Sequence, residues 1–452
     1  MTDIYRVACA AGFSGDRTDV ARPLVDELLK QDGPSCLIFE SLAERTLALA
    51  QLERDQNAEL GYEPLLSEML APVLADCING GIPIIGNFGA ANPNGAARLI
   101  ATIAKQQGFP DIRIAIVSGD DIAQSELHSR LNTFLSPQDQ EALACSRLVS
   151  ANVYLGAQEI ADALNAGAQV VVTGRVADPA LTVGPLMAYF KKDWTDWNFL
   201  GAATMAGHLL ECGAQVTGGY FADPGVKDVP GLATLGFPIV EFDAEGGFCV
   251  TKPSATGGIV NRMTVTEQLL YELHDPAMYL TPDVVADISQ TQISDQGEDR
   301  VVVTGIKGHP RPASLKANIC IDGGWLAEAE ISYAGFNAYE RAQLAAQIIR
   351  ERLSYLDLRV DFIGSSSIFA SDAGDGPQFK SKEGFEDIRM RVATAHADHY
   401  QALQVCREVT ALYTCGPAGG GGVRTSLKPR LNTLVCFIPR ELVHASHHFF
   451  KG

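Results

Sequence analysis

The sequence predicts an α/β protein, with a parallel sheet covered by helices on both faces in the N-terminal half and an α+β domain after it. Short apolar runs rich in β-branched residues recur along the first ~190 residues, each followed by a polar or glycine-rich segment and then a helical one. From about Gly236 the pattern changes to short alternating strands separated by glycine and proline. We therefore expect two domains, 1–225 and 226–452. A (β/α)₈ barrel is the alternative, but the chain has too few such units.

Length and composition restrict the kind of protein. The 452 residues, 46% of them hydrophobic, can bury a large core. No apolar run of ~18 residues could span a bilayer, and the N-terminus lacks a signal peptide, so we expect a cytoplasmic protein without membrane insertion. A net charge of −19 disfavours a nucleic-acid partner. The cysteines are scattered singly, as reduced thiols are, and a homo-oligomer is the default assembly.

The first unit combines a strand at Ile4–Ala11 with a helix over roughly 19–30. Two glycines around Ser14 permit a tight turn between them that exposes backbone N–H groups, and Asp16 and Arg17 project from this turn. We predict that Ser14 binds substrate and that Asp16 and Arg17 take part in catalysis.

The second unit is a strand at Ser35–Phe39 that ends in Glu40, a candidate catalytic residue. A helix follows, in which Ser41 and Glu44 have the spacing of a capping box. Glu44 therefore has two interpretations, as a helix cap or as a site residue.

The third unit has a strand at Ile82–Gly86, fed by a helix from about 64 to 79. Asn87 and Asn92 follow the strand, among small residues that let a ligand approach the backbone. Each asparagine can cap the next helix or hydrogen-bond a ligand carbonyl, and we predict that both bind substrate.

The fourth strand, Ile112–Val117, leads to Asp120 and Asp121 before a helix over about 122–135. Paired aspartates beyond a strand can hold a divalent metal such as Mg²⁺, or one of them can cap the helix.

A fifth strand is expected at Leu148–Leu155, and the sixth contains the consecutive residues Val170–Val172, typical of a strand buried on both faces. Arg175 and Asp178 follow it, and Pro179 opens a helix. Ligands of open α/β sheets bind beyond the carboxyl ends of the strands, so we predict that Arg175 and Asp178 are catalytic.

The helical segment from about 194 to 212 places His208, Glu211 and Cys212 on one face. This spacing can present a base and an acid or two metal ligands, and it is also common in packed helices; we predict a catalytic role for His208. Further on, Lys252 begins a glycine-containing loop that suits an anionic ligand or simply connects a hairpin.

The C-terminal half is expected to form an α+β layer. Its elements are helices over roughly 337–354 and 398–412, strands near 358–363 and 387–395, and a last strand at Leu434–Pro439.

A glycine-rich loop at Gly416–Arg424 lies between the last helix and the last strand. Gly419 and Gly420 can direct backbone N–H groups toward a phosphate or carboxylate, with Arg424 adding charge. The loop lacks the Lys-Ser/Thr ending of a P-loop, which disfavours ATP hydrolysis of that type. Anion or acyl-CoA binding, a subunit interface and a flexible lid are the open interpretations.

Six segments are long enough to be specific when taken together. They are Gly12–Arg17, Phe39–Thr46, Gly89–Pro93, Val172–Pro179, Gly207–Phe221 and Gly416–Arg424. Through them the chain resembles the acyclic terpene utilisation family AtuA along nearly its entire length. Longer relatives carry an additional C-terminal ferredoxin-like domain, which we expect to be absent here.

The resemblance implies a role in the degradation of citronellol- and geraniol-type isoprenoids through acyl-CoA intermediates, with CoA as part of the substrate. It also suggests a lyase that splits a 3-hydroxy-3-alkylglutaryl-type thioester and releases acetate. Such cleavage needs a base for the hydroxyl proton and a cation for the developing enolate. Hydration or dehydration of an enoyl thioester needs nearly the same groups, so lyase and hydratase both remain open.

The strand-end residues can supply these groups. Asp16, Glu40, Asp120 or Asp178 could be the base, Arg17 or Arg175 the cation, and Asp120 with Asp121 a metal site. The alternative is a non-catalytic acyl-CoA-binding or scaffold subunit, which needs no convergent titratable groups. If the strand-end residues converge in one cleft, the enzyme hypothesis is favoured over the scaffold hypothesis.

Overall fold

The computed structural model describes residues 3–365 and 386–451, and the chain forms two compact units. Unit 1 contains Met1–Glu141, Val149–Cys320 and Thr433–Gly452, and unit 2 contains Ala142–Leu148 and Ile321–Asn432. This division differs from the boundary expected at residues 225 and 226, which falls inside unit 1. The reason is that strands from the middle of the chain join the N-terminal sheet.

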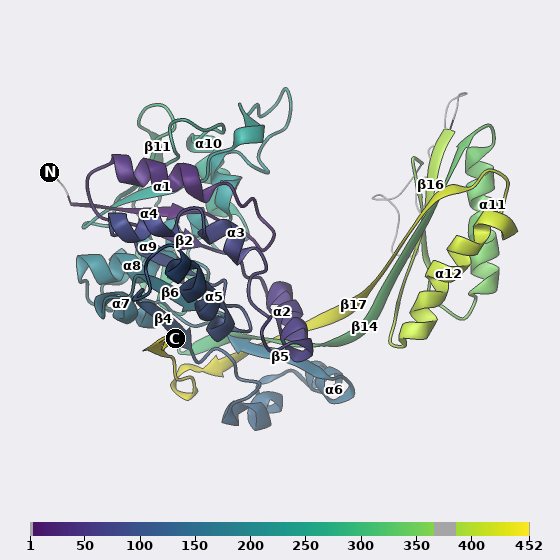
Figure 1. The fold of residues 1–452 in the computed structure, drawn as a ribbon, viewed down its shortest axis with the longest axis horizontal. Coiled ribbons are helices and arrows are strands. Elements are labelled where there is room, and N and C mark those ends of the chain that lie inside the picture. Colours follow the sequence, from purple (N-terminus) through teal and green to yellow (C-terminus); the bar gives the residue numbers. More distant parts are fainter. Residues whose placement is uncertain (1–2, 366–385, 452) are drawn as a thin grey trace. The chain divides into compact units, whose positions relative to one another are not determined.

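The centre of unit 1 is a parallel sheet, as the sequence predicts for an α/β fold (Figure 1). Its five parallel strands lie in the order β1-β2-β3-β6-β4. Their bounds are Ile4–Cys9 (β1), Ser35–Phe39 (β2), Ile84–Gly86 (β3), Val170–Thr173 (β6) and Ile114–Ser118 (β4).

Antiparallel strands extend this sheet on both sides to ten strands. On the β1 side they are β7 (Ile239–Asp243), β8 (Phe248–Thr251), β12 (Val301–Thr304) and β11 (Gln292–Asp295). On the opposite side β18 (Ser446–Phe449) pairs with β4. The sequence analysis missed β18, whose short mixture of polar and aromatic residues gives little strand signal.

Helices cover both faces of the sheet, as predicted, and two hydrophobic cores result. Side chains alternate along a strand, so Val171 belongs to one core while Val170 and Val172 belong to the other. The Val170 core includes α1 (Ala21–Lys30), α3 (Leu66–Leu70), α4 (Leu74–Gly80) and α5 (Pro93–Gln106). The Val171 core includes α7 (Gln158–Asn165), α8 (Ala180–Phe190), α9 (Trp197–Glu211) and α10 (Arg262–Leu270).

Two local expectations were wrong. The fifth strand, β5 (Leu148–Val153), does not enter the parallel sheet but pairs with the long strand β14 (Ser314–Gly335). The helix expected over 122–135 is a 3₁₀ helix at Glu126–Phe134, which α6 (Pro137–Cys145) follows.

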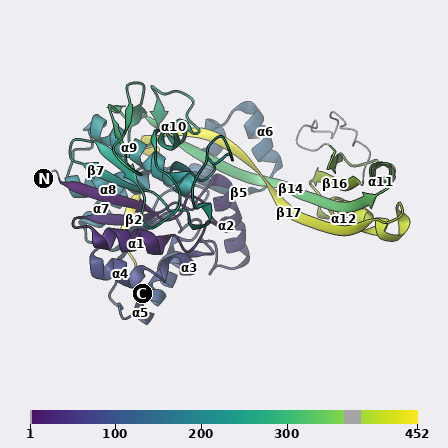
Figure 2. The ribbon, with the colours of Figure 1, turned by 90° about the horizontal axis from the view of Figure 1, so that it is seen from above.

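Unit 2 is the α+β layer expected from the C-terminal pattern. Its sheet has the order β15-β16-β14-β17, and Figures 1 and 2 show α11 and α12 packed together against it. The elements are β15 (Arg359–Ile363), β16 (Glu386–His396), β17 (Gly421–Pro439), α11 (Ala338–Arg352) and α12 (His399–Cys415). The long strands β14 and β17 contribute residues to both units.

A small sheet also belongs to unit 1 and packs against α9. Its strands are β13 (Lys307–His309), β10 (Val285–Asp287) and β9 (Tyr279–Leu280). Among the helices that the structure describes, none is long and apolar enough to cross a membrane.

Candidate functional site

A pocket of about 1200 Å³ lies at the carboxyl ends of the parallel strands, and all its lining residues belong to unit 1. The segments after β1, β2 and β6 contribute Asp16, Glu40 and Arg175 to the lining. Asn87, after β3, stands behind Glu40, and Asp120, after β4, stands behind Arg175. The strand-end residues therefore converge as expected for a parallel sheet. Asp16, Glu40 and Arg175 face the cavity, whereas Asn87 and Asp120 lie behind them.

Arg175 is buried at the centre of this arrangement, with 2% of its side chain exposed. Its Nη2 donates a hydrogen bond of 2.7 Å to Asp178 Oδ1, and its Nη1 donates to the carbonyl oxygen of Leu42. The guanidinium lies 4.0 Å from the centroid of the Tyr154 ring. Burial alone would lower the pKa of Arg175, but the nearby acidic groups raise it, so Arg175 remains a cation.

Glu40 is a buried carboxyl held in place by two donors. Its Oε1 accepts from Leu42 N at 2.9 Å and from Asn87 Nδ2 at 2.8 Å, while Asn87 Oδ1 accepts from Ser41 N. Glu40 Oε2 has no hydrogen-bond partner within the described residues. Burial and the charge of Asp178 raise the pKa of Glu40 well above its usual value, which favours the protonated form of Glu40.

Asp178 is a second carboxyl group in the pocket, and its charge acts on Glu40. Its side chain lines the pocket and is 32% exposed. Burial raises the pKa of Asp178 to about 7, against the opposing effect of Arg175. The pocket thus contains two carboxyl groups with raised pKa values, of which Asp178 ionises near neutral pH, and acid–base catalysis uses groups of this kind.

Glu44 and Tyr154 line the pocket, and the sequence analysis did not select them as site residues. The capping interpretation of Glu44 was wrong, because Ala43 is the N-cap of α2 (Glu44–Gln56) and makes no side-chain capping bond. Instead Tyr154 Oη donates to Glu44 Oε1, and Lys316 Nζ lies 3.3 Å from the same oxygen. Burial alone would raise the pKa of Glu44, but the hydrogen bond from Tyr154, the backbone N–H of Glu44, the charge of Arg175 and Asn318 lower it to about 2.

His208 stands behind the pocket, and Glu211 lines it. The two side chains are joined through His208 Nδ1 and Glu211 Oε1 at 2.9 Å, and His208 is 1% exposed. Burial alone would lower the pKa of His208, but the charge and hydrogen bond of Glu211 raise it. The predicted catalytic role of His208 therefore becomes, at most, an action through Glu211.

This pair makes stability depend on pH. Because the folded-state pKa of His208 is raised, its charge adds stability that is complete below about pH 6.5, the unperturbed pKa, and is lost as pH rises through the folded-state value. We expect His208→Gln to lower the melting temperature at pH 6, with a deficit that shrinks at higher pH. Thermal melts of both proteins between pH 5.5 and 9 test this; a deficit independent of pH would contradict it.

The first turn is built by its own residues. Asp16 Oδ2 accepts from Gly12 N at 2.9 Å and Oδ1 from Arg17 N at 2.8 Å, so Asp16 closes the turn. A Cβ on Gly12 would lie 2.5 Å from the backbone carbon of Cys212, because the turn packs against the end of α9. Arg17 lines the pocket but is ion-paired with Asp19, and Ser14 is not among the lining residues.

Several predicted binding residues have structural roles outside this pocket. Asn92 caps α5 by accepting from Gly95 N, so here the capping alternative holds. Lys252 Nζ is paired with Asp299 at 2.9 Å and bonded to the carbonyl oxygen of Thr256, so its loop is held internally. Gly419, Gly420 and Arg424 belong to unit 2, whereas every lining residue belongs to unit 1.

The aspartates proposed for a metal also have protein partners. Asp120 Oδ2 accepts from Arg175 N at 2.8 Å and Asn152 Nδ2 at 3.0 Å, and Asp121 Oδ1 accepts from Ala123 N. Within the described residues, no three His, Cys, Asp or Glu side chains are grouped so that they could hold a metal ion. The structure gives the Asp120–Asp121 metal hypothesis no third ligand.

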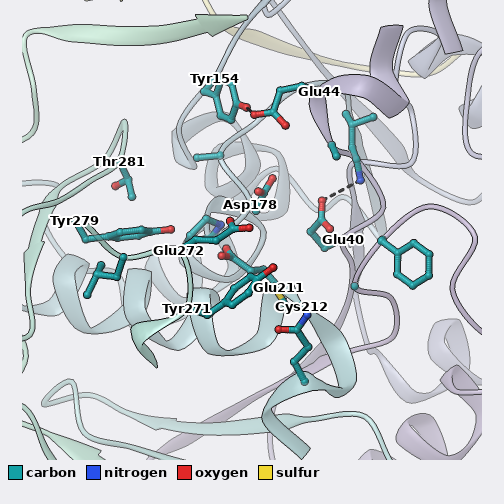
Figure 3. A pocket seen from close by; sticks show the side chains of 18 of the residues that line it. Glu40, Glu44, Tyr154, Asp178, Glu211, Cys212, Tyr271, Glu272, Tyr279 and Thr281 are labelled. Atoms are coloured by element: carbon teal, nitrogen blue, oxygen red, sulfur yellow. Dashed lines mark hydrogen bonds between the residues drawn. The ribbon is translucent and has the colours of Figure 1, made fainter. Parts of the chain in front are cut away.

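The pocket has an acidic interior. Figure 3 shows Asp178, Glu211 and Glu272 gathered in one space, with Glu40 and Tyr279 on either side. The basic lining residues Arg17, Arg175 and Lys316 are each paired with a carboxylate. The sequence analysis did not identify Tyr279 and Glu272, because they come from a segment without a recognisable motif.

The fold and the pocket define an α/β protein with a pocket lined by titratable groups at the carboxyl ends of a parallel sheet. The chain belongs to the acyclic terpene utilisation family AtuA, whose family model matches residues 5–449. No curated protein matched the chain.

Proposed function

We propose that this protein is an isoprenoid or branched acyl-CoA catabolic enzyme, and that it hydrates an enoyl thioester or dehydrates the 3-hydroxyacyl thioester. The observation that carries the proposal is the pair of Glu40 and Asp178, two carboxyl groups that line one pocket and whose pKa values are both raised by burial. The family supports a catabolic role in acyclic terpene utilisation. We also propose a cytoplasmic location and a homo-oligomer, on the sequence grounds given above.

The pair provides both proton transfers of a hydration. Asp178 as the carboxylate takes a proton from the attacking water, whose oxygen bonds to C3 of the enoyl group. Glu40, through its unpaired Oε2, gives a proton to C2, and the reverse steps dehydrate the 3-hydroxyacyl thioester. After each turnover the two groups return to their starting states by exchange with water.

A lyase is the second candidate, since the same base could take the proton of a tertiary hydroxyl. The charges of the pocket lining favour a hydratase over a lyase. A 3-hydroxy-3-alkylglutaryl-type substrate carries a free carboxylate, and the acidic interior would repel it because each basic lining residue is already ion-paired. For CoA phosphates, the ion pair of Arg17 with Asp19 is exposed enough to exchange partners.

We expect the purified protein to bleach the ultraviolet absorbance of a branched 2-enoyl-CoA, the chromophore that hydration removes. Because the pKa of Asp178 is about 7 and the base must be ionised, the rate should rise with pH through that value. Asp178→Asn should remove this rise along with most of the activity. Release of acetate from a 3-hydroxy-3-alkylglutaryl thioester would establish the lyase instead, and tight thioester binding without turnover would favour the scaffold alternative.

A further inference from the structure

The exposed part of the pocket lining carries several large apolar side chains. Six large apolar or aromatic lining residues are between 46% and 86% exposed, whereas Glu40 and Arg175 are 7% and 2% exposed. The six, which we call the apolar mouth, are Phe13, Tyr220, Leu232, Met278, Leu280 and Phe437. Large apolar side chains that are left exposed around one pocket indicate a surface that binds a ligand.

The mouth is assembled from segments that are distant in sequence. Phe13 belongs to the turn after β1, Leu232 to a 3₁₀ helix, Leu280 to β9 and Phe437 to β17. All of them line the same pocket within unit 1. Several independent segments therefore bring exposed apolar side chains to the same pocket that Glu40 and Asp178 line.

We infer that the apolar mouth binds the hydrocarbon chain of a thioester substrate whose reacting end reaches Glu40 and Asp178. This inference rests on the proposed function for the identity of the reacting end, but the binding of the chain does not require turnover. Glu272 and Asp275 also line the pocket and are exposed, so the entrance disfavours a chain that ends in a carboxylate. The ligand class is therefore a thioester whose acyl chain is apolar to its end.

Each methylene transferred from water to an apolar surface should tighten binding about fourfold. We propose calorimetric titration with straight-chain acyl N-acetylcysteamine thioesters, which are uncharged and lack the CoA phosphates, lengthened two carbons at a time. We expect the dissociation constant to fall with each addition and to level off once the chain extends beyond the mouth.

Two pairs of variants test whether binding depends on the apolar mouth or on exposed apolar side chains anywhere on the surface. Met278→Ser and Leu280→Ser change mouth residues that are 54% and 56% exposed. Met263→Ser and Leu270→Ser are matched controls, because these residues are 61% and 52% exposed and do not line the pocket. The mouth variants should weaken binding of the longest thioester at least fivefold and flatten the dependence on chain length, while the controls retain both.

The outcomes distinguish this inference from the proposed function. Suppose that binding depends on chain length and on Met278 and Leu280, but that no enoyl thioester is hydrated. This result would support chain binding by the apolar mouth and would contradict the proposed hydratase activity. If the protein hydrates enoyl thioesters but binds them equally well at every chain length, the inference about the apolar mouth is wrong and the proposed function stands. If the mouth variants change the oligomeric state in sedimentation but leave thioester binding unchanged, the surface is a subunit interface and the inference is wrong.

Discussion

Glu40→Gln should reduce the turnover of a branched enoyl thioester by about 10²–10⁴-fold and leave the melting temperature almost unchanged. The amide keeps an oxygen that can accept from Leu42 N and Asn87 Nδ2, so the local hydrogen bonds survive. Burial raises the pKa of Glu40 and so favours its uncharged form, which the neutral amide of glutamine resembles. What it removes is an acidic proton for C2 of the substrate.

The measurement is kcat with saturating thioester, together with a thermal melt of the same preparation. Glu53→Gln is the matched control, because Glu53 is exposed on α2 and does not line the pocket. A Glu40→Gln protein with full turnover would remove Glu40 from the mechanism. A protein that loses activity and stability together would show that Glu40 is needed for folding rather than for proton transfer.

The sequence predicted where Glu40, Arg175 and Asp178 lie in the fold because that information is local. Arg175 and Asp178 directly follow a run of buried β-branched residues, and Glu40 follows another, so their place at the edge of a parallel sheet could be predicted. The same local pattern explains why β1, β2 and β6 lie close to their expected positions.

The parts that could not be predicted depend on contacts between distant segments. Tyr154 donates to Glu44 across 110 positions of sequence, and β5 pairs with β14 rather than with the parallel strands. A strand pattern shows that a segment is extended but not which edge it joins. The expected boundary at 225 and 226 failed for the same reason, because β7 and β8 continue the N-terminal sheet.

The same limit applies to the predicted binding residues. Asn92 and Lys252 have the right chemistry for a ligand, but each is occupied by protein partners. Polar residues near glycine serve as often to fix a loop as to bind a substrate. Only the structure shows whether their hydrogen-bonding groups are already engaged.

Arg175→Ala should destabilise the protein by about 3–5 kcal/mol, the range for removing one partner of a buried ion pair. The change leaves Asp178 without its cation, removes the donor to the Leu42 carbonyl and opens a space beside the Tyr154 ring. Arg175→Lys should recover only part of this, because an ammonium cannot reproduce the planar set of donors and the stacking on Tyr154. Urea denaturation of the two variants measures the loss.

Arg98→Ala is the matched control, because the ion pair of Arg98 with Glu59 is exposed and should contribute within about 1 kcal/mol. The double variant Arg175→Ala/Asp178→Asn tests whether this loss comes from the unpaired charge of Asp178. Because the double variant has no unpaired carboxylate at this place, it should be more stable than Arg175→Ala alone while remaining inactive. If it is no more stable, the cost of Arg175→Ala comes from lost packing on Tyr154, and the pair then matters for charge at the site rather than for the fold.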